Sequence, residues 1–218
     1  MTDTTLRIEI AGGAAVTALR TAARGARWTF VYAPGAGSNI HDPFGAYAAR
    51  ALAGQGVATV RFQFPYMEAG RRSPDRTPAL EATWRAAINA ARDSKTRIVV
   101  GGRSMGGRIA SMVVADGVEV DALALFAYPL HPPGKPEQLR TDHLTSIKAP
   151  ALFVSGTKDA FGAPDELRAA SKIVKRSTLH LLEHADHGFA VSKSSGRTRD
   201  DVWAEAVAVF AAWITAIK

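Results

Sequence analysis

The 218-residue sequence contains no cysteine. This absence excludes disulfide bonds, thiolate metal sites and a cysteine nucleophile. The sequence also lacks an apolar run long enough to cross a bilayer, and its first residues do not form the basic and then apolar pattern of a secretory signal. We therefore expect a cytoplasmic protein that has no membrane segment.

Acidic residues are fewer than basic ones, with 20 Asp and Glu against 27 Lys and Arg, so the net charge is +7. Such an excess raises the question of a nucleic-acid partner. The basic residues are spread along the chain, however, and no zinc-finger motif, RNA-recognition motif or aromatic-interleaved basic stretch accompanies them. We interpret them as a solvated basic surface and expect no nucleic-acid partner. The densest group is Arg71 and Arg72 with Arg76, and Arg71 and Arg72 could instead attract an anionic substrate.

Internal repeats, low-complexity tracts and long linkers are missing too, and the length suits one well-buried domain covering residues 1–218. Apolar runs alternate with helical patterns along the chain. Strands are predicted at 6–10, 14–19, 28–33, 57–64, from 97 to the turn at 102, and at 122–128, 150–155 and 178–182; helices are predicted at 43–52, 77–92, after 104, and at 164–174 and 200–217. This order predicts an α/β fold, a mostly parallel twisted sheet with helices on both faces.

The predicted strand that begins at Arg97 leads into Gly102-Arg103-Ser104-Met105-Gly106, which matches the nucleophile-elbow pattern G-x-S-x-G. A serine nucleophile must stand clear of the backbone at the top of a strand, so the chain turns sharply there. Glycines on both sides of the serine let the strand and the following helix approach each other. Ser104 is therefore the candidate nucleophile.

A serine needs a base to remove its proton and an acid to orient that base. Asp159 follows the apolar strand at 150–155, and His187 follows the last predicted strand, in the order Ser, Asp, His typical of this elbow. Asp159 could instead cap its turn, and His184 is an alternative base. We predict a triad of Ser104, Asp159 and His187.

The developing oxyanion needs two N–H donors. We assign one to Met105, which opens the helix after the nucleophile. The second should come from the glycine-rich turn at 34–38, where Ala36 is the first choice and Gly37 the alternative.

Other residues near the expected site have weaker patterns. His41, Tyr66 and His131 are candidates for substrate contact, although core packing explains Tyr66 equally well. No H-x-x-x-H or H-E-x-x-H spacing is present, so we expect neither a metal nor a cofactor. The proline-rich segment 129–141 is expected to line the site, since ligands of open parallel sheets bind beyond the carboxyl ends of the strands. It is too short for a lid domain.

The chain resembles the α/β-hydrolase superfamily. It is most similar to the small, lidless, dienelactone-hydrolase-like subfamily related to the testis-expressed and histone-acetyltransferase-complex hydrolase-like proteins. The motifs that carry the resemblance are Pro34-Gly35-Ala36-Gly37, Arg61-Phe62-Gln63-Phe64-Pro65-Tyr66, Gly102-Arg103-Ser104-Met105-Gly106-Gly107-Arg108, Tyr128-Pro129-Leu130-His131, Ser155-Gly156-Thr157-Lys158-Asp159 and His187. The resemblance implies a sheet of about eight strands, the same triad and no cofactor.

These observations predict a serine hydrolase that cleaves small ester, thioester or related acyl bonds through an acyl-enzyme. The expected partner is a small-molecule acyl substrate. The alternative is a non-catalytic interaction scaffold built on the same fold, because a fold does not guarantee its chemistry.

Overall fold

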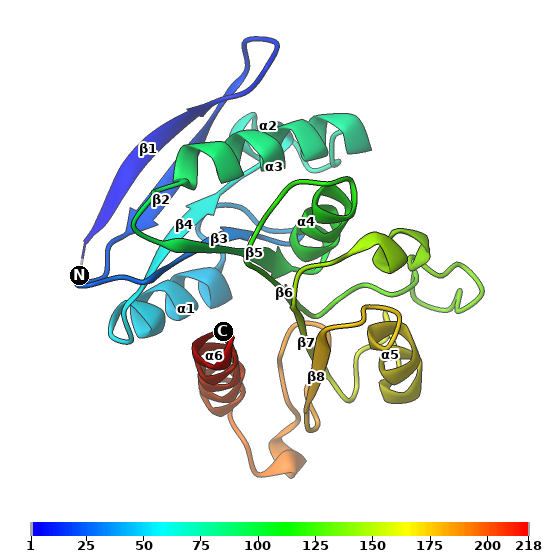
Figure 1. The fold of residues 1–218 in the computed structure, drawn as a ribbon. Coiled ribbons are helices and arrows are strands. Elements are labelled where there is room, and N and C mark those ends of the chain that lie inside the picture. Colours follow the sequence, from blue (N-terminus) through cyan, green and yellow to red (C-terminus); the bar gives the residue numbers. More distant parts are fainter. Residues whose placement is uncertain (1, 218) are drawn as a thin grey trace.

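The computed structural model describes residues 2–217, which form an eight-stranded sheet in the order β1-β2-β4-β3-β5-β6-β7-β8 (Figure 1). The strands are β1 (Asp3–Glu9), β2 (Ala15–Thr21), β3 (Trp28–Ala33), β4 (Val57–Phe62), β5 (Arg97–Arg103), β6 (Ala122–Phe126), β7 (Ala151–Gly156) and β8 (Ser177–Leu182). β2 runs antiparallel to both β1 and β4, and all other neighbouring pairs are parallel. The predicted α/β architecture is confirmed.

Helices cover both faces of this sheet. They are α1 (Pro43–Ala53), α2 (Pro65–Glu68), α3 (Thr77–Ala91), α4 (Met105–Ala115), α5 (Pro164–Ser171) and α6 (Arg199–Ala216). Figure 1 shows α1 and α6 on one face and α3, α4 and α5 on the other. Each face has its own buried apolar cluster, so two hydrophobic layers hold the sheet between them. None of the helices within residues 2–217 combines the length and apolarity needed to cross a membrane.

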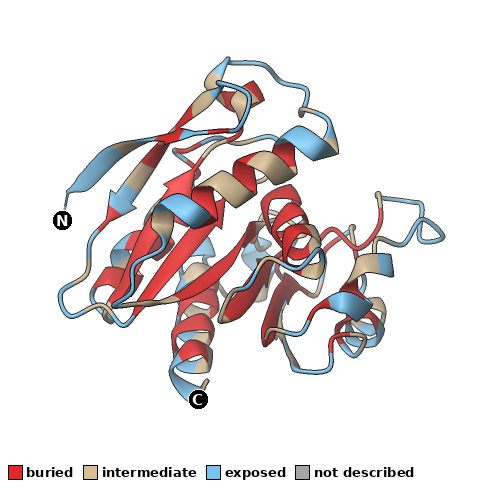
Figure 2. Ribbon diagram, turned by 45° about the horizontal axis from the view of Figure 1, so that its top comes forward, coloured by how far each residue is buried: buried red, intermediate tan, exposed pale blue. Residues whose placement is uncertain are grey.

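The central strands are apolar along their whole length because both of their faces are covered. Every residue of β3, β4, β6 and β7 is buried, and these strands form the red centre of Figure 2. The edge strand β1 instead exposes most of its residues. Burial on two sides therefore explains the near-continuous apolar runs from which the parallel sheet was predicted.

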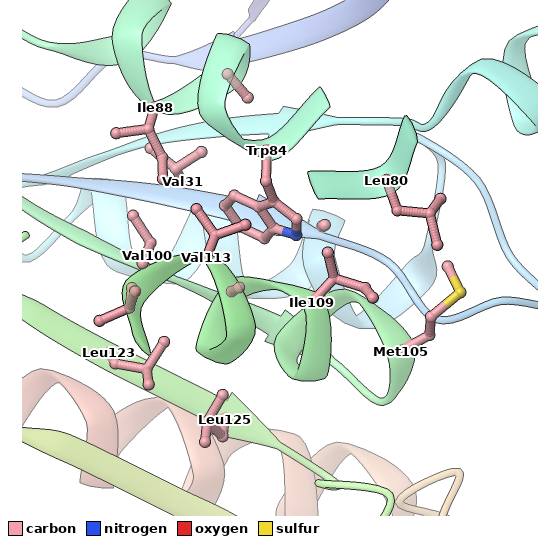
Figure 3. Close-up of a cluster of buried hydrophobic side chains, with 14 of the residues drawn as sticks. Val31, Leu80, Trp84, Ile88, Val100, Met105, Ile109, Val113, Leu123 and Leu125 are labelled. Carbon is pink, nitrogen blue, oxygen red and sulfur yellow. The ribbon is translucent and has the colours of Figure 1, made fainter. Parts of the chain in front are cut away.

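One apolar layer supports the helix that follows the elbow. Trp84 points from α3 toward α4 in Figure 3, close to Ile109 and Val113. The Trp84 side chain is fully buried, and its Nε1–H donates a hydrogen bond of 3.1 Å to the carbonyl oxygen of Gly106. The indole thus fixes the first turn of α4 against α3. This turn directly follows the candidate nucleophile Ser104.

Most predicted element boundaries agree with the structure to within a few residues. α1 begins at Pro43, and the Asp42 carboxylate accepts the Gly45 N–H at 2.8 Å, as a helix N-cap does. β4 ends at Phe62 rather than residue 64, because Pro65 opens the short helix α2, which the sequence did not predict. A 3₁₀ turn at Asp142–Ser146 was also not predicted.

The proline-rich segment 129–141 has no regular structure, as expected, and it folds back on itself. The Tyr128 hydroxyl donates to the Arg140 carbonyl at 2.6 Å, and the Arg140 N–H donates to the Leu130 carbonyl at 2.8 Å. These bonds close the excursion at its base, next to the end of β6. Among residues 2–217, no lid therefore covers this edge of the sheet.

Candidate active site

Ser104 occupies the turn between β5 and α4 with φ 51° and ψ −121°, a backbone conformation that a residue with a Cβ rarely adopts. The Ser104 N–H donates to the Phe126 carbonyl at 2.9 Å, and its carbonyl accepts the Arg108 N–H at 3.0 Å. The neighbouring strand and the first turn of α4 therefore hold the strained residue in place.

Gly102 and Gly106 are required by the close approach of β5 and α4 to β3. A Cβ at Gly102 would lie 2.1 Å from the Ala33 carbonyl oxygen, and a Cβ at Gly106 would lie 2.2 Å from the same atom. Both distances are far below van der Waals contact. The two glycines of the G-x-S-x-G pattern thus make room for the backbone of β3.

Two loops at the carboxyl ends of β7 and β8 bring Asp159 and His187 to this serine. His187 Nδ1 lies 2.8 Å from Asp159 Oδ2 and 3.0 Å from Oδ1, and His187 Nε2 lies 2.8 Å from Ser104 Oγ. A carboxylate only accepts hydrogen bonds, so Nδ1 carries the proton and Nε2 is free to accept from the serine hydroxyl. The Asp159 side chain is fully buried, while that of His187 is 22% exposed.

Phe161 and Asp186 complete these two loops, and sequence reasoning missed both. The Phe161 ring stacks on the His187 imidazole with centroids 4.1 Å apart, and its N–H donates to Asp159 Oδ1 at 2.8 Å. Asp186 Oδ1 accepts the N–H groups of Gly188 and Ala190 at 2.7 and 2.8 Å, which folds the turn that carries His187. An aromatic residue two positions after the acid was the only available signal.

The alternative base His184 and the nearby acidic residue Asp165 lie elsewhere. His184 is exposed, and its N–H donates to Thr157 Oγ1 at 2.8 Å. The Asp165 side chain is 98% exposed in the first turn of α5. Neither residue lines the cavity around Ser104.

Ala36 and Met105 line the same cavity as Ser104, as does Gly37. Within residues 2–217, the N–H groups of Ala36 and Met105 have no hydrogen-bond acceptor, so both are available to a ligand. The Tyr66 hydroxyl donates to the Ala36 carbonyl at 2.9 Å and so holds the adjoining Ala36–Gly37 peptide. Burial, with the nearby Asp75 carboxylate, raises the pKa of Tyr66 to about 12, so the hydroxyl keeps its proton at neutral pH.

Comparison with known proteins identifies the family of this chain. The alpha/beta hydrolase domain family matches residues 26–215, which is most of the chain. The chain belongs to the α/β-hydrolase family. The resemblance stated from the sequence motifs is thereby confirmed.

Solved structures of such hydrolases share the fold. A lidless α/β serine hydrolase from Xanthomonas campestris is 19% identical, with a TM-score of 0.76 over 98% of this chain and 95% of that one. A dienelactone hydrolase from Anabaena variabilis is 17% identical, with a TM-score of 0.79 over 99% and 98%. The esterase domain of a Rhodothermus marinus protein is 18% identical, with a TM-score of 0.72 over 98% of both chains.

The structure places three expected substrate contacts of the hydrolase away from the cavity. His41 is exposed on the turn before α1, and its N–H donates to Asn39 Oδ1. Tyr66 is buried, and its hydroxyl donates to the Ala36 carbonyl. His131 is buried, with Nδ1 2.8 Å from the Pro132 carbonyl and Nε2 3.2 Å from Glu166 Oε2, so it ties the proline-rich segment to α5. These three side chains stay outside the proposed substrate site.

The cavity of the hydrolase has a volume of about 620 Å³ and opens above Ser104. The glycine-rich turn, the start of α4, Phe161 and His187 line it, together with Arg103, Arg108 and Arg140, which sequence reasoning did not single out. No group of three or more His, Cys, Asp or Glu side chains suited to a metal ion occurs in the described part of the chain.

A half-buried histidine in the 3₁₀ turn Asp142–Ser146 makes stability depend on pH. His143 Nε2 lies 2.7 Å from Ser111 Oγ on α4. Burial, together with the charge of Arg108, lowers the pKa of His143 from 6.5 to about 4, although Asp142 opposes this shift. The unfolded chain therefore takes up this proton first as the pH falls. Below about pH 6.5 the folded state loses stability, and the loss levels off near pH 4; because solvent screens the partly exposed ring, we expect it to reach only roughly 2 kcal/mol.

Urea denaturation of the wild type and of His143→Gln at pH 7 and pH 5 measures this effect. We expect the wild type to lose more stability than the variant between these values, because glutamine takes up no proton. Equal losses in the two proteins would contradict a neutral, half-buried His143.

Proposed function

We propose that this hydrolase is a serine hydrolase that cleaves small ester, thioester or related acyl bonds. The observation that carries the proposal is the continuous chain of contacts from Ser104 Oγ to His187 Nε2 at 2.8 Å and from His187 Nδ1 to Asp159 Oδ2 at 2.8 Å. The family match supports hydrolysis in general, and these three side chains supply its nucleophile, base and orienting acid.

In the acylation step, Ser104 Oγ attacks the substrate carbonyl carbon while its proton passes to His187 Nε2. The carbonyl oxygen becomes an oxyanion that the N–H groups of Met105 and Ala36 bind; one such donor is worth about 10²–10³ in rate. The bond to the leaving group then breaks, and His187 returns the proton to the departing oxygen or sulfur. The acyl group remains bonded to Ser104.

Water completes the cycle by the same route. His187 accepts a proton from a water molecule as its oxygen attacks the acyl carbon, and the oxyanion forms again beside the two N–H groups. Collapse of this intermediate breaks the bond to Ser104 Oγ, which takes the proton back from His187. The products are a free acid and a regenerated serine.

The open cavity favours small acyl groups. It measures about 620 Å³, and the proline-rich segment beside it is closed on itself rather than folded over the site. Long alkyl chains gain most from a deep apolar tunnel, whereas polar and charged side chains make up much of this lining.

Labelling with a fluorophosphonate probe tests the nucleophile directly. We expect intact mass spectrometry to show one adduct on the wild-type protein, because an activated serine attacks the phosphorus atom, and none on Ser104→Ala. A panel of p-nitrophenyl esters then measures chain-length preference, with acetate and butyrate cleaved faster than decanoate. A folded wild-type protein that forms no adduct would refute an activated Ser104, and a preference for decanoate would refute the small acyl substrate.

A further inference from the structure

Three arginines, Arg103, Arg108 and Arg140, line the cavity above Ser104, and they differ in how their charge is balanced. Arg103 faces the carboxylate of Asp42, with Nη1 3.7 Å from Oδ1, and its other amino group lies 3.5 Å from the His187 carbonyl oxygen. Asp42 is buried and also lines the cavity. The charge of Arg103 therefore has a partner within the protein.

Arg108 and Arg140 have no such partner. Within residues 2–217, no carboxylate lies within ion-pair distance of either guanidinium. Arg108 Nη1 contacts only the Met112 sulfur at 3.5 Å, and Arg140 Nη1 donates to the Pro129 carbonyl at 3.2 Å. Sulfur is a weak acceptor, and each guanidinium has several further N–H donors. Most of the donors on these two side chains are therefore available to a ligand.

Both arginines are fixed by the fold rather than spread over the surface. Arg108 lies one helical turn after Ser104 on α4 and is partly buried. Arg140 is held at the base of the proline-rich segment by the Tyr128 hydroxyl on its carbonyl and by its own N–H on Leu130. The two side chains thus reach the cavity from two separate, well-anchored elements.

The positive charge of Arg108 lowers the pKa values of two neighbouring side chains. Burial, together with the charge of Arg108, lowers the pKa of Arg140 below its ordinary value. Burial and the same charge also lower the pKa of His143. Like charges held close in a partly buried cavity repel each other, and a bound anion relieves that repulsion.

We propose that Arg108 and Arg140 form an anion-binding subsite, and that the substrate is an ester carrying a second, oxyanionic group such as a carboxylate or a phosphate. This inference rests on the proposed function of Ser104 for the hydrolytic step, but the binding of the anion does not. Guanidinium groups suit it because they bind two oxygens of one carboxylate or phosphate at once. The subsite orients the ester so that its carbonyl carbon meets Ser104 Oγ.

Paired esters test the substrate class. The p-nitrophenyl half-ester of adipic acid carries a free carboxylate on the acyl side, and a neutral ester of the same length ends in an isopropyl group instead. A third ester ends in a phosphonate, and an acetate ester of a hydroxy acid carries its carboxylate on the alcohol side. We expect the wild-type kcat/KM to favour at least one anionic ester over its neutral counterpart by about 10- to 100-fold, as hydrogen bonds to charged groups allow.

Arg108→Gln and Arg140→Gln should each reduce that ratio by about tenfold, mainly through KM, and Arg108→Lys should restore part of it. Arg24→Gln is the matched control, because it removes one positive charge from an exposed turn between β2 and β3. A wild-type enzyme that prefers every neutral ester, or a ratio that the Arg24 and Arg108 variants change equally, would overturn the subsite.

A binding measurement separates this proposal from the proposed function. Calorimetry at low salt measures adipate and inorganic phosphate binding to Ser104→Ala, with and without Arg108→Gln. Binding that depends on Arg108 in a protein whose wild type forms no fluorophosphonate adduct would uphold the subsite and reject the hydrolase mechanism. Labelling of Ser104 with no arginine-dependent binding and no anionic preference would reject the subsite and keep the mechanism.

Discussion

Replacing Ser104 with alanine is expected to lower kcat/KM for a short-chain ester by about 10⁴-fold or more, because the nucleophile and its contact with His187 are lost together. Asp159→Asn should lower it by a similar factor of about 10⁴, since an amide beside Nδ1 favours the wrong imidazole tautomer. Steady-state assays with p-nitrophenyl acetate measure both effects. Asp165→Asn, on an exposed side chain of α5, is the matched control and should remain near wild type.

Measuring the stability of the Ser104 variants shows whether a loss of activity comes from the missing nucleophile or from unfolding. Ser104 has φ 51°, where a Cβ is strained, so Ser104→Gly should be about 1 kcal/mol more stable than Ser104→Ala while equally inactive. Urea denaturation of the two variants gives the difference. An alanine variant that keeps more than a few per cent of the activity would show that another group attacks the substrate.

Gly106→Ala is expected to have a large effect on folding. The added Cβ would lie 2.2 Å from the Ala33 carbonyl oxygen and 2.6 Å from the Ala33 carbonyl carbon and the Pro34 oxygen, which are backbone atoms that cannot turn aside. The start of α4 would have to leave β3, and Trp84 would lose its bond to the Gly106 carbonyl. We expect a loss of about 3 kcal/mol or more, or no folded protein.

Gly54→Ala is the matched control for this substitution. Gly54 follows α1 with φ −66°, and a Cβ there would meet no atom closer than 3.5 Å. Its stability should stay within about 0.5 kcal/mol of wild type. Thermal unfolding followed by circular dichroism compares the two variants. If Gly106→Ala were as stable as Gly54→Ala, the close contact between α4 and β3 would not exist in solution.

The strands and helices were accessible from the sequence because their signals are local. β3, β6 and β7 are buried on both faces, so their apolar runs are unbroken, and Asp42 with Pro43 marks the start of α1. The short helix α2 and the 3₁₀ turn at Asp142–Ser146 were missed because neither is long enough to show a periodic pattern.

Within the candidate site, the sequence singled out the residues whose order and spacing follow from the parallel sheet. Ser104, Asp159 and His187 each follow a strand, and the carboxyl ends of parallel strands meet at one edge. For the three expected substrate contacts, the sequence indicated only an approximate position near that edge; these are His41, Tyr66 and His131. Loop geometry turns Tyr66 to the Ala36 carbonyl and His131 to Glu166, and spacing along the chain does not contain that information.

By itself, the sequence determined the α/β architecture, the elbow at Ser104 and the placing of Asp159 and the candidate histidines after later strands, because periodicity, glycine spacing and chain order encode them. Only the tertiary structure decided that His187 rather than His184 contacts Ser104, that Phe161 stacks on its ring, and that Arg108 and Arg140 share the cavity. Such contacts join residues far apart in the chain. They depend on how loops close and where side chains turn once the sheet and its helices are packed.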